Sequence, residues 1–303
     1  MFAQGSRSSL GVGVEGTFGT AANTYTNLPI KTHSLDLTKE RLQGQDIQAD
    51  RMQRVDRHGN RNAAGSIEVD LRKGNYDDLL ESAFLSTFDS SDEITIGTTP
   101  KFLTIEDAMN DIGQYRLFTG MTVSTATFNI APNQMVETTF EMVGKDMSVS
   151  GTGKTVGAST INQPFDSYNG AIYEGGVGPS DLVTVITSII FSITNSFAPT
   201  FVVGSDTAPQ LEFGRAVIEG SMSVYAEDAT FIDRFLGETE SELQVSVDDP
   251  SGANSYTFYM PRIKYNGASV PLANEQSRII ELPFVALYDG DASGDLGTAL
   301  RLT

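Results

Sequence analysis

The sequence contains no cysteine, and its only histidines are His33 and His58. The absence of cysteine excludes disulfide bonds, thiolate metal sites and a cysteine nucleophile. The two histidines lie far apart in the sequence, so a two-histidine metal site or a histidine-based catalytic triad is poorly supported. A chain without cysteine also fits assembly in a reducing cytoplasm.

A secretory signal and a long apolar run are also missing. The first residues, MFAQGSRSSLGVGVEG, have no basic segment followed by an apolar one. The most apolar window, residues 182–202, is interrupted by Ser, Thr, Asn and Pro, and it is rich in β-branched residues. This composition indicates a buried strand and not a membrane span. We therefore expect a soluble protein that is made in the cytoplasm and does not contact a membrane.

Positive charge is scarce, with 20 Lys and Arg against 39 Asp and Glu and a formal net charge of −19. Such a chain repels nucleic-acid phosphates, so a conventional DNA-binding protein is disfavoured. The length of 303 residues and the hydrophobic content of 39% are sufficient for a large buried core in one or two domains.

The stretch SGTGKTVG at residues 150–157 ends like a phosphate-binding loop. That motif requires a glycine five positions before Gly153, where this chain has Ser148. The residues that follow are rich in turn formers, whereas the motif requires a helix there. The sequence therefore predicts a linker or surface arm, in which Lys154 is solvated and binds no phosphate.

Several acidic clusters suggest catalytic or metal chemistry without completing it. Asp77 and Asp78 suit the first turn of a helix, where the helix dipole favours negative charge. Asp248 and Asp249 precede a turn, and DGDASGD at 289–295 lacks the glutamate that completes a calcium loop. No nucleophile, base and oxyanion donor combine. We predict no catalytic, cofactor-binding or metal-binding residue, and no enzyme.

An internal repeat organises the chain. Residues 65–85 match 220–240 at an offset of 155, through Gly-Ser, an alternating strand and a short amphipathic helix. The flanking segments 33–40 and 187–194, and 133–146 and 274–289, follow in the same order. We predict a first unit at 1–146, a linker or arm at 147–179 and a second unit at 180–303. Generic β patterning is the alternative explanation of this similarity.

Alternation of apolar and polar residues dominates both copies, as in Ile67, Val69 and Leu71 against Ser66, Glu68 and Asp70. The fold class is therefore mainly β, with two similar β-sandwich or partial-barrel units. Each unit carries one short α-helix, at about 75–85 and 230–237, with Asn75 and Thr230 as candidate N-caps.

A long basic loop is predicted at 41–64, where five arginines gather in an otherwise acidic protein: Arg41, Arg51, Arg54, Arg57 and Arg61. It is either a solvated mobile loop or a docking arm whose guanidinium groups meet carboxylates of an identical subunit. Nucleic-acid binding is a third interpretation. The loop has no aromatic residues for base stacking, and acids interrupt it at Asp46, Asp50 and Asp56.

Together, GVGVEGTFGTAANTYTNLPIKTHSLDLTKE at 11–40, the long loop, GSIEVDLRKGNYDDLLESAF at 65–84 and MVETTFEMVGKD at 135–146 resemble the tail tube proteins of long, non-contractile-tailed bacteriophages. The resemblance implies β-sandwich subunits that form rings, which stack into a hollow tube. Single-unit members form hexameric rings, so a tandem duplication implies a trimeric, pseudo-hexameric ring that closes a β-barrel.

The resemblance also implies partners and places. The subunit would contact itself, the tape measure protein, the tail tip and the tail terminator, in the virion tail and in the host cytoplasm during assembly. The arginine loop would contact the next ring, although the second copy has a weaker counterpart. Double-stranded DNA would pass through the lumen without specific binding. Candidate lumen acids are Glu68, Asp70, Glu137 and Glu141, although the sequence leaves open which strand face is inward.

Two other function classes stay open from the sequence. A virion decoration or adhesin module would bind a host surface ligand, but aromatic-rich loops, which would favour it, are missing. A hydrolase with an acidic site is disfavoured because no convergent site is evident.

Overall fold

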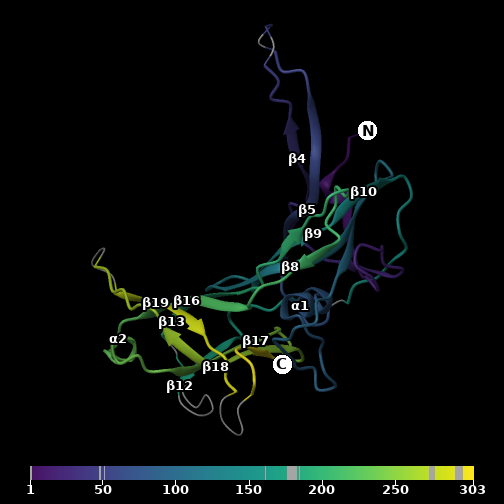
Figure 1. The fold of residues 1–303 in the computed structure, drawn as a ribbon. Coiled ribbons are helices and arrows are strands. Elements are labelled where there is room, and N and C mark those ends of the chain that lie inside the picture. The colour runs from purple at the N-terminus through teal and green to yellow at the C-terminus, as the bar shows by residue number, and fades with distance from the viewer. Residues whose placement is uncertain are drawn as a thin grey trace.

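The computed structural model describes residues 2–47, 49–50, 52–160, 162–175, 183, 185–272, 277–290 and 296–303. Strands dominate it, and the helices are short (Figure 1). The predicted mainly-β class is therefore confirmed. The sheets of a single chain stay open, so the ring-shaped barrel concerns the assembly.

Short loops connect most of the strands. The strands of the first half are β1 (Ser8–Val14), β2 (Tyr25–Leu28), β3 (Thr32–His33), β4 (Asp36–Gln43), β5 (Asp56–Asp70), β6 (Ile94–Thr95), β7 (Leu103–Met109), β8 (Gln114–Ile130) and β9 (Glu137–Gly144). The later strands are β10 (Asp146–Ser150), β11 (Val156–Gly157), β12 (Ala171–Gly175), β13 (Ile186–Thr194), β14 (Ala198–Thr200), β15 (Gln210–Glu212), β16 (Val217–Tyr225), β17 (Ser241–Asp248), β18 (Ser255–Tyr265), β19 (Ile279–Ala286) and β20 (Arg301–Leu302). The helices are α1 (Asp77–Phe84), α2 (Thr230–Leu236) and a 3-10 turn (Gly5–Arg7).

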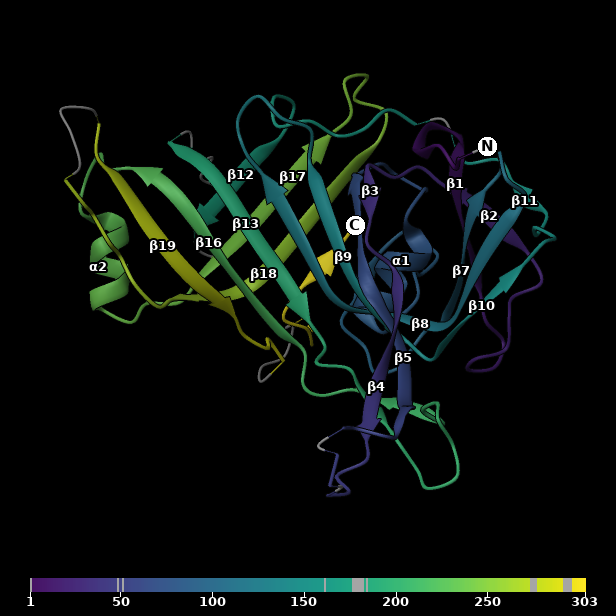
Figure 2. The ribbon, with the colours of Figure 1, turned by 90° about the horizontal axis from the view of Figure 1, so that it is seen from above.

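The two halves use the same order of strand pairing. β5 lies between β4 and β9, and β9 pairs with β8. In the second half β16 lies between β13 and β19, and β19 pairs with β18. A short helix follows β5 and another follows β16 (Figure 2).

Gly65 of β5 and Gly220 of β16 occupy equivalent positions in the two halves. A Cβ atom on Gly65 would lie 2.7 Å from Leu35 Cα, and one on Gly220 would lie 2.8 Å from Phe191 Cβ. Gly65 and Gly220 are 155 residues apart, the offset of the sequence repeat. Each glycine therefore lets the neighbouring strand approach closely at the same place in its half.

One strand pair joins the two halves into a continuous sheet. The second part of β8 runs antiparallel to β13, from Ile189 opposite Ile130 to Thr194 opposite Thr125. The resulting strand order is β4-β5-β9-β8-β13-β16-β19, which Figure 2 shows as one curved array. The junction is hydrogen-bonded backbone, so it is a continuation of the sheet and not a loose domain contact.

β8 is long enough to serve two sheets because it bends near Gly120. Its first part pairs with β7 and β10, and its second part pairs with β9 and β13. Gly120 has a φ of +65°, a conformation that favours glycine, and its N–H donates to Glu15 Oε1 at 2.8 Å. The buried Glu15 carboxylate thus holds the bend from the side of β1.

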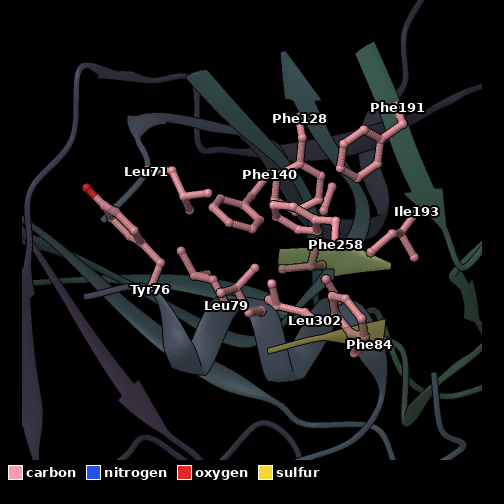
Figure 3. Close-up of a cluster of buried hydrophobic side chains, with 14 of the residues drawn as sticks. Leu71, Tyr76, Leu79, Phe84, Phe128, Phe140, Phe191, Ile193, Phe258 and Leu302 are labelled. Carbon is pink, nitrogen blue, oxygen red and sulfur yellow. The ribbon is translucent and has the colours of Figure 1, made fainter. Parts of the chain in front are cut away.

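The core lies behind the continuous sheet and is shared by both halves. Figure 3 shows Phe128 of β8, Phe191 of β13 and Phe258 of β18 packed together above Leu79 and Phe84 of α1. The centroids of the Phe128 and Phe258 rings are 4.8 Å apart. Because both halves contribute to one apolar cluster, neither half buries its own strands without the other.

The helix positions are close to the prediction, but both predicted N-caps are wrong. The N-cap residues are Tyr76 and Ala229, and neither side chain caps its helix. Asn75 Nδ2 instead donates to the Thr160 carbonyl at 3.2 Å. Thr230 is the first helical residue, and its N–H donates to Asp228 Oδ1 at 2.9 Å. The capping oxygen of α2 therefore comes from Asp228, two positions before its first helical residue.

The segment predicted as a linker or arm carries strands of both sheets. β10 pairs with β8, and β12 pairs with β17. The Lys154 side chain is exposed, as predicted, while its backbone N–H donates to the buried Glu106 carboxylate at 2.8 Å. The Gly-Lys-Thr stretch is thus held by a carboxylate of its own chain. Most of the calcium-like stretch 289–295 lies outside the described residues.

Candidate functional site

The exposed face of the continuous sheet carries the acids that the sequence singled out. Ile67 and Val69 of β5 are fully buried, so Glu68 and Asp70 face the other way. In the pairing with β9, Asp70 lies opposite Glu137, and Ser66 lies opposite Glu141. All four predicted acids therefore lie on one solvent-facing surface, which we call the acidic face.

The acidic face continues over the second half. Ser223 of β16 lies opposite Glu281 of β19, and its hydroxyl donates to Glu281 Oε2 at 2.9 Å. In the first half Glu68 lies opposite Thr139, and Thr32 donates to Glu68 Oε2 at 3.3 Å. Each half thus places one carboxylate in the equivalent cross-strand pair, but on opposite strands.

The sequence analysis missed the acids of the second half, Glu219 and Glu281. Their strands show the same alternation as those of the first half, and this signal was available. It was not sufficient, because the repeat offset matches Glu68 to Ser223, and only the strand register shows that Glu281 takes its place. Glu219 and Glu281 are both exposed.

The charges of the acidic face are only partly balanced. Lys31 Nζ contacts Glu137 directly and lies 3.7 Å from Asp70 Oδ1. The hydrogen bond to Glu137 raises the pKa of Lys31. A second hydrogen bond, between Glu68 and Glu137, raises the pKa of Glu68 and lowers the pKa of Glu137. Between the acids, β8 and β13 present hydroxyls, with Thr127 opposite Ser192.

The region predicted as a long loop is a projecting hairpin, so that prediction is wrong. β4 and β5 pair from Asp36–Ala64 out to Gln43–Asp56, and Gly44 N–H donates to the Val55 carbonyl at 2.9 Å. Figure 1 shows this hairpin extending away from the rest of the chain. Charged residues occupy both of its faces because neither face covers a core. The alternation that reveals strands elsewhere is therefore missing here.

Most of the described arginines of the hairpin already have partners within the chain. Arg41 Nη2 lies 2.7 Å from Asp56 Oδ2, and Arg54 Nη2 lies 2.6 Å from Asp50 Oδ2. The hydrogen bond between Arg41 and Asp56 raises the pKa of Arg41 and lowers that of Asp56. Arg51 lies outside the described residues.

Arg61 and Arg57 complete the set. Arg61 lies 3.1 Å from Asp146 and 3.3 Å from Asp206, so it fixes the base of the hairpin. Arg57 makes no ion pair with any residue that the structure describes. The paired guanidinium groups of Arg41, Arg54 and Arg61 therefore contact the hairpin itself and its base. Each exposed ion pair of this kind contributes only a small stabilising free energy.

Unpartnered apolar side chains gather at the hairpin tip, and the sequence analysis missed them. Ile47 is 99% exposed and Met52 is 69% exposed. Leu42 and Val55, on the strands below, are also exposed. Four exposed apolar side chains on one protruding element are typical of a contact surface.

The second half has a shorter hairpin, β14–β15, at the place of the projecting β4–β5 hairpin. β14 and β15 form a separate two-stranded sheet, and Val203 in their connection is fully exposed. The Asp206 carbonyl accepts from Arg61 N–H at 2.8 Å. The counterpart therefore lies against the base of the β4–β5 hairpin, and does not project in the same way.

A family model for phage tail tube proteins matches residues 5–286. The chain belongs to the phage tail tube protein family. The resemblance found in the sequence is thereby confirmed. It is a structural protein of the phage virion tail, and the family implies assembly with further copies of itself into the tail tube. No curated protein matches the sequence.

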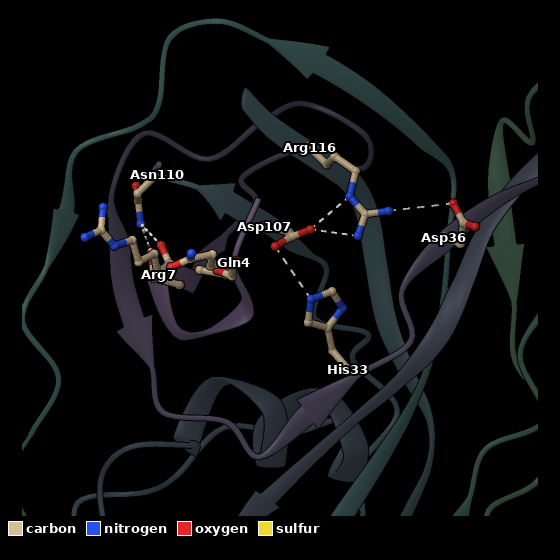
Figure 4. A network of polar contacts seen from close by, with 9 residues as sticks. Gln4, Arg7, His33, Asp36, Asp107, Asn110 and Arg116 are labelled. Carbon is tan, nitrogen blue, oxygen red and sulfur yellow. Dashed lines mark hydrogen bonds and ion pairs between the residues drawn. The ribbon is translucent and has the colours of Figure 1, made fainter. Parts of the chain in front are cut away.

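At the root of the hairpin, this tail tube protein has a polar network around the buried Asp107 (Figure 4). Arg116 Nη2 lies 2.7 Å from Asp107 Oδ2, and His33 Nε2 lies 3.6 Å from Asp107 Oδ1. Burial alone would raise the pKa of Asp107, but hydrogen bonds from His33 and Arg116 hold that pKa below its usual value. Arg116 Nη1 also lies 3.8 Å from Asp36 Oδ1. Because Arg116 belongs to the first part of β8, which pairs with β7 and β10, this contact links that sheet to β4.

The described part of the tail tube protein holds no cluster of three or more His, Cys, Asp or Glu side chains able to bind a metal ion. None of its described helices is long and apolar enough to cross a membrane.

Proposed function

We propose that three copies of this tail tube protein form a pseudo-hexameric ring, and that the rings stack into a tube through which double-stranded DNA is ejected. One observation carries the proposal: a single sheet spans both halves of the chain and presents one continuous acidic face. A ring of such sheets has an acidic inner wall, and it removes the open edges of each subunit.

The ring contains three chains because each chain supplies two similar units, 1–146 and 180–303, connected by 147–179. The β8–β13 junction supports this reading, since it joins the two units through the same antiparallel pairing that a ring needs between subunits. Three chains then supply six equivalent sheets. This heterologous contact closes into a ring when three chains complete one full turn without a rise along the axis.

The acidic face lines the lumen in this proposal. Glu68, Asp70, Glu137 and Glu141 of the first unit, with Glu219 and Glu281 of the second, surround the DNA with negative charge. Carboxylates repel the phosphate backbone, so the DNA slides without being held. The hydroxyls of β8 and β13 keep the wall hydrated without adding positive charge.

The projecting hairpin contacts a neighbouring ring. Residues 39–61 contain six Lys and Arg against four Asp and Glu, in a chain whose net charge is −19. An acidic neighbouring ring therefore attracts this hairpin more strongly than it attracts the acidic parts of the chain. The exposed Ile47 and Met52 supply the apolar contact area, and Arg57 is free to pair with a carboxylate of the neighbour.

Further partners follow from the tube. The proposed partners are the tape measure protein, the tail tip and the tail terminator. Assembly takes place in the host cytoplasm. None of these roles requires a cofactor or catalysis.

Negative-stain electron microscopy of the concentrated, purified protein tests the proposal. We expect hollow tubes whose end-on averages show three-fold symmetry with six similar lobes. Tubes with six whole chains per ring would keep the tube and overturn the trimer. Monomers that do not polymerise even with tail-tip complexes added would overturn the tube function in favour of a decoration or adhesin module.

A further inference from the structure

We propose that the ring closes by antiparallel pairing of the outer edge of residues 33–39, which run from β3 into β4, with residues 266–272 of a second copy, in the register that places Asp36 opposite Ser269. This inference rests on the proposed function, because it names the surfaces that meet within the ring. The internal β8–β13 junction supplies the geometry, and the repeated pairing of the two halves supplies the register.

The segment 266–272 is the equivalent of the second part of β8. Thr127 of β8 lies opposite Thr139, which lies opposite Glu68. Ser269 lies opposite Glu281, which lies opposite Ser223. Glu68 and Ser223 are 155 residues apart, like the two glycines. Ser269 therefore occupies the position of Thr127.

β4 is, by the same reasoning, the equivalent of β13. Asp36 lies opposite Ala64, and Ser192 lies opposite Glu219. Ala64 and Glu219 are again 155 residues apart, so Asp36 occupies the position of Ser192. Within the chain, Thr127 lies opposite Ser192. Repeating that contact between two copies places Ser269 opposite Asp36.

Among the described residues, neither of the two equivalent edges is paired with a further strand. β13 pairs with β16 on one side and with β8 on the other, whereas β4 pairs only with β5 among the described residues. Residues 266–272 contact β19 on one side, through the bridge between Ser269 and Glu281 and through Asn266 N–H, which donates to the Pro283 carbonyl at 2.8 Å. Their other side has no strand among the described residues.

The backbone groups on the two edges also alternate in matching phase. Ser269 and Glu281 exchange two hydrogen bonds, at 3.1 and 2.9 Å, so the groups of Ala268 and Val270 point to the open side. Ser34 N–H donates to the Ser66 carbonyl at 2.9 Å, so the groups of Leu35 and Leu37 point away from β5.

The proposed register places Val270 opposite Leu35 and Ala268 opposite Leu37, which joins the open groups of both edges. Pro271 does not interrupt this pairing, because the position of its missing N–H faces β19.

Side-chain burial supports the match. Ala268 and Val270 pack against the core, as their equivalents Ala126 and Phe128 do. Leu272 is 75% exposed, whereas its equivalent Ile130 is only 7% exposed. Ile130 is covered because β13 lies beside it. In the proposed register Leu272 lies opposite His33 of β3, so it is an apolar side chain that residues 33–35 of a second copy would cover.

In the free subunit, charged side chains form hydrogen bonds with backbone groups on these two edges. Leu37 N–H donates to Asp36 Oδ1 at 2.8 Å, and the Val270 carbonyl accepts from Arg278 Nη2 at 2.7 Å. Such contacts protect an edge from random pairing. Asp36 and Arg278 carry opposite charges, and the proposed register brings both to the same junction. Ring closure therefore replaces both contacts with backbone pairing and brings Arg278 near Asp36, whose other partner is Arg116 at 3.8 Å.

The absence of cysteine from the chain makes a cross-linking test specific. In the proposed junction Asp36 and Ser269 form a non-hydrogen-bonded pair, whose Cα atoms lie about 4.5 Å apart, within the range of a disulfide. Asp36 and Ser269 are both exposed, so Asp36→Cys with Ser269→Cys removes the Asp36–Arg116 contact but changes no core side chain. Tubes of this variant are oxidised and separated on a denaturing gel without reductant. We expect covalent dimers and trimers, with no larger species.

The matched control is Thr38→Cys with Ser269→Cys, a register shift of two residues that keeps the same face. Its Cβ atoms would be about 7 Å apart, too far for efficient disulfide formation. Tubes that cross-link at the control pair, or at neither pair, would overturn the proposed junction while leaving the tube function intact. A variant and a wild-type protein that both form no tubes, even with tail-tip complexes added, would overturn the proposed function itself.

Discussion

The Phe128 ring of β8 stacks on the Phe191 ring of β13, with centroids 5.0 Å apart and planes inclined by 22°. The two residues belong to different halves of the chain, and both are almost completely buried. The backbone junction between the halves is thus reinforced by an aromatic contact in the shared core.

Replacing Phe191 tests how strongly the halves depend on each other. We expect Phe191→Ala to lower the free energy of unfolding by about 3–5 kcal/mol, because it leaves a cavity beneath the junction. Urea denaturation followed by circular dichroism measures the change. Ser192→Ala, on the opposite face of the same strand, serves as the control and should change stability by less than about 0.5 kcal/mol. Equal effects of the two substitutions would contradict the shared core.

The apolar hairpin tip should control ring stacking. We expect the double variant Ile47→Asp, Met52→Asp to keep the fold, since both side chains are exposed, and to form rings that do not stack into tubes. Sedimentation and electron microscopy distinguish rings from tubes. Val203→Asp, on the shorter counterpart, is the control and should impair stacking less. Full-length tubes from the double variant would show that the tip makes no essential contact.

Reversing charge on the acidic face should make the tube retain DNA. We expect tubes of Glu219→Lys, Glu281→Lys to bind short double-stranded DNA at low salt, and to release it as the salt concentration rises. Co-sedimentation with labelled DNA measures binding. Glu227→Lys with Asp233→Lys, at exposed residues just before and within α2, is the control that makes the same change in net charge. Equal binding by the control would place the acidic face outside the lumen.

The turn after β17 predicts a pH dependence of stability. Asp249 accepts hydrogen bonds from Asn254 at 2.7 Å and from the Ser251 hydroxyl at 2.7 Å, and these bonds lower its pKa from 3.8 to about 2. A lowered folded-state pKa stabilises the protein above the unfolded value of 3.8, and this contribution is lost as the pH falls toward 2.

We therefore expect Asp249→Asn to be less stable than the wild type at pH 6, with the difference shrinking as the pH falls from about 4 to 2. Urea midpoints measured at several pH values provide the comparison. Asp248→Asn, the adjacent carboxylate, is the control. A difference between Asp249→Asn and wild type that stays constant with pH would show that the Asp249 charge does not contribute.

Local patterns in the sequence were sufficient for much of the fold. Alternation identified β5 and β9, and amphipathic spacing identified α1 and α2. The same alternation placed Glu68 with Asp70, and Glu137 with Glu141, because residues two apart on a strand share a side. Only the register between β5 and β9 brought the two pairs onto one face. Capping failed as a prediction because the N-cap side chains depend on the exact entry of the chain into each helix.

The hairpin shows where sequence patterns stop. β4 and the first half of β5 cover no core, so they have no apolar alternation, and only the ladder between them identifies them as strands. The arginines were visible in the sequence, but their partners Asp50, Asp56, Asp146 and Asp206 were not. The exposed Ile47 and Met52 gained their meaning only when the structure placed them at the tip.

The sequence by itself determined the mainly-β class, the internal repeat offset of 155, the acidic charge and the family, because these depend on composition and on periods of a few residues. Only the tertiary structure decided that β8 pairs with β13, that the acids of both halves share one face, and that two equivalent edges stay open. These relationships join residues far apart in the chain, and hydrogen-bond register between distant strands is fixed by packing rather than by local sequence.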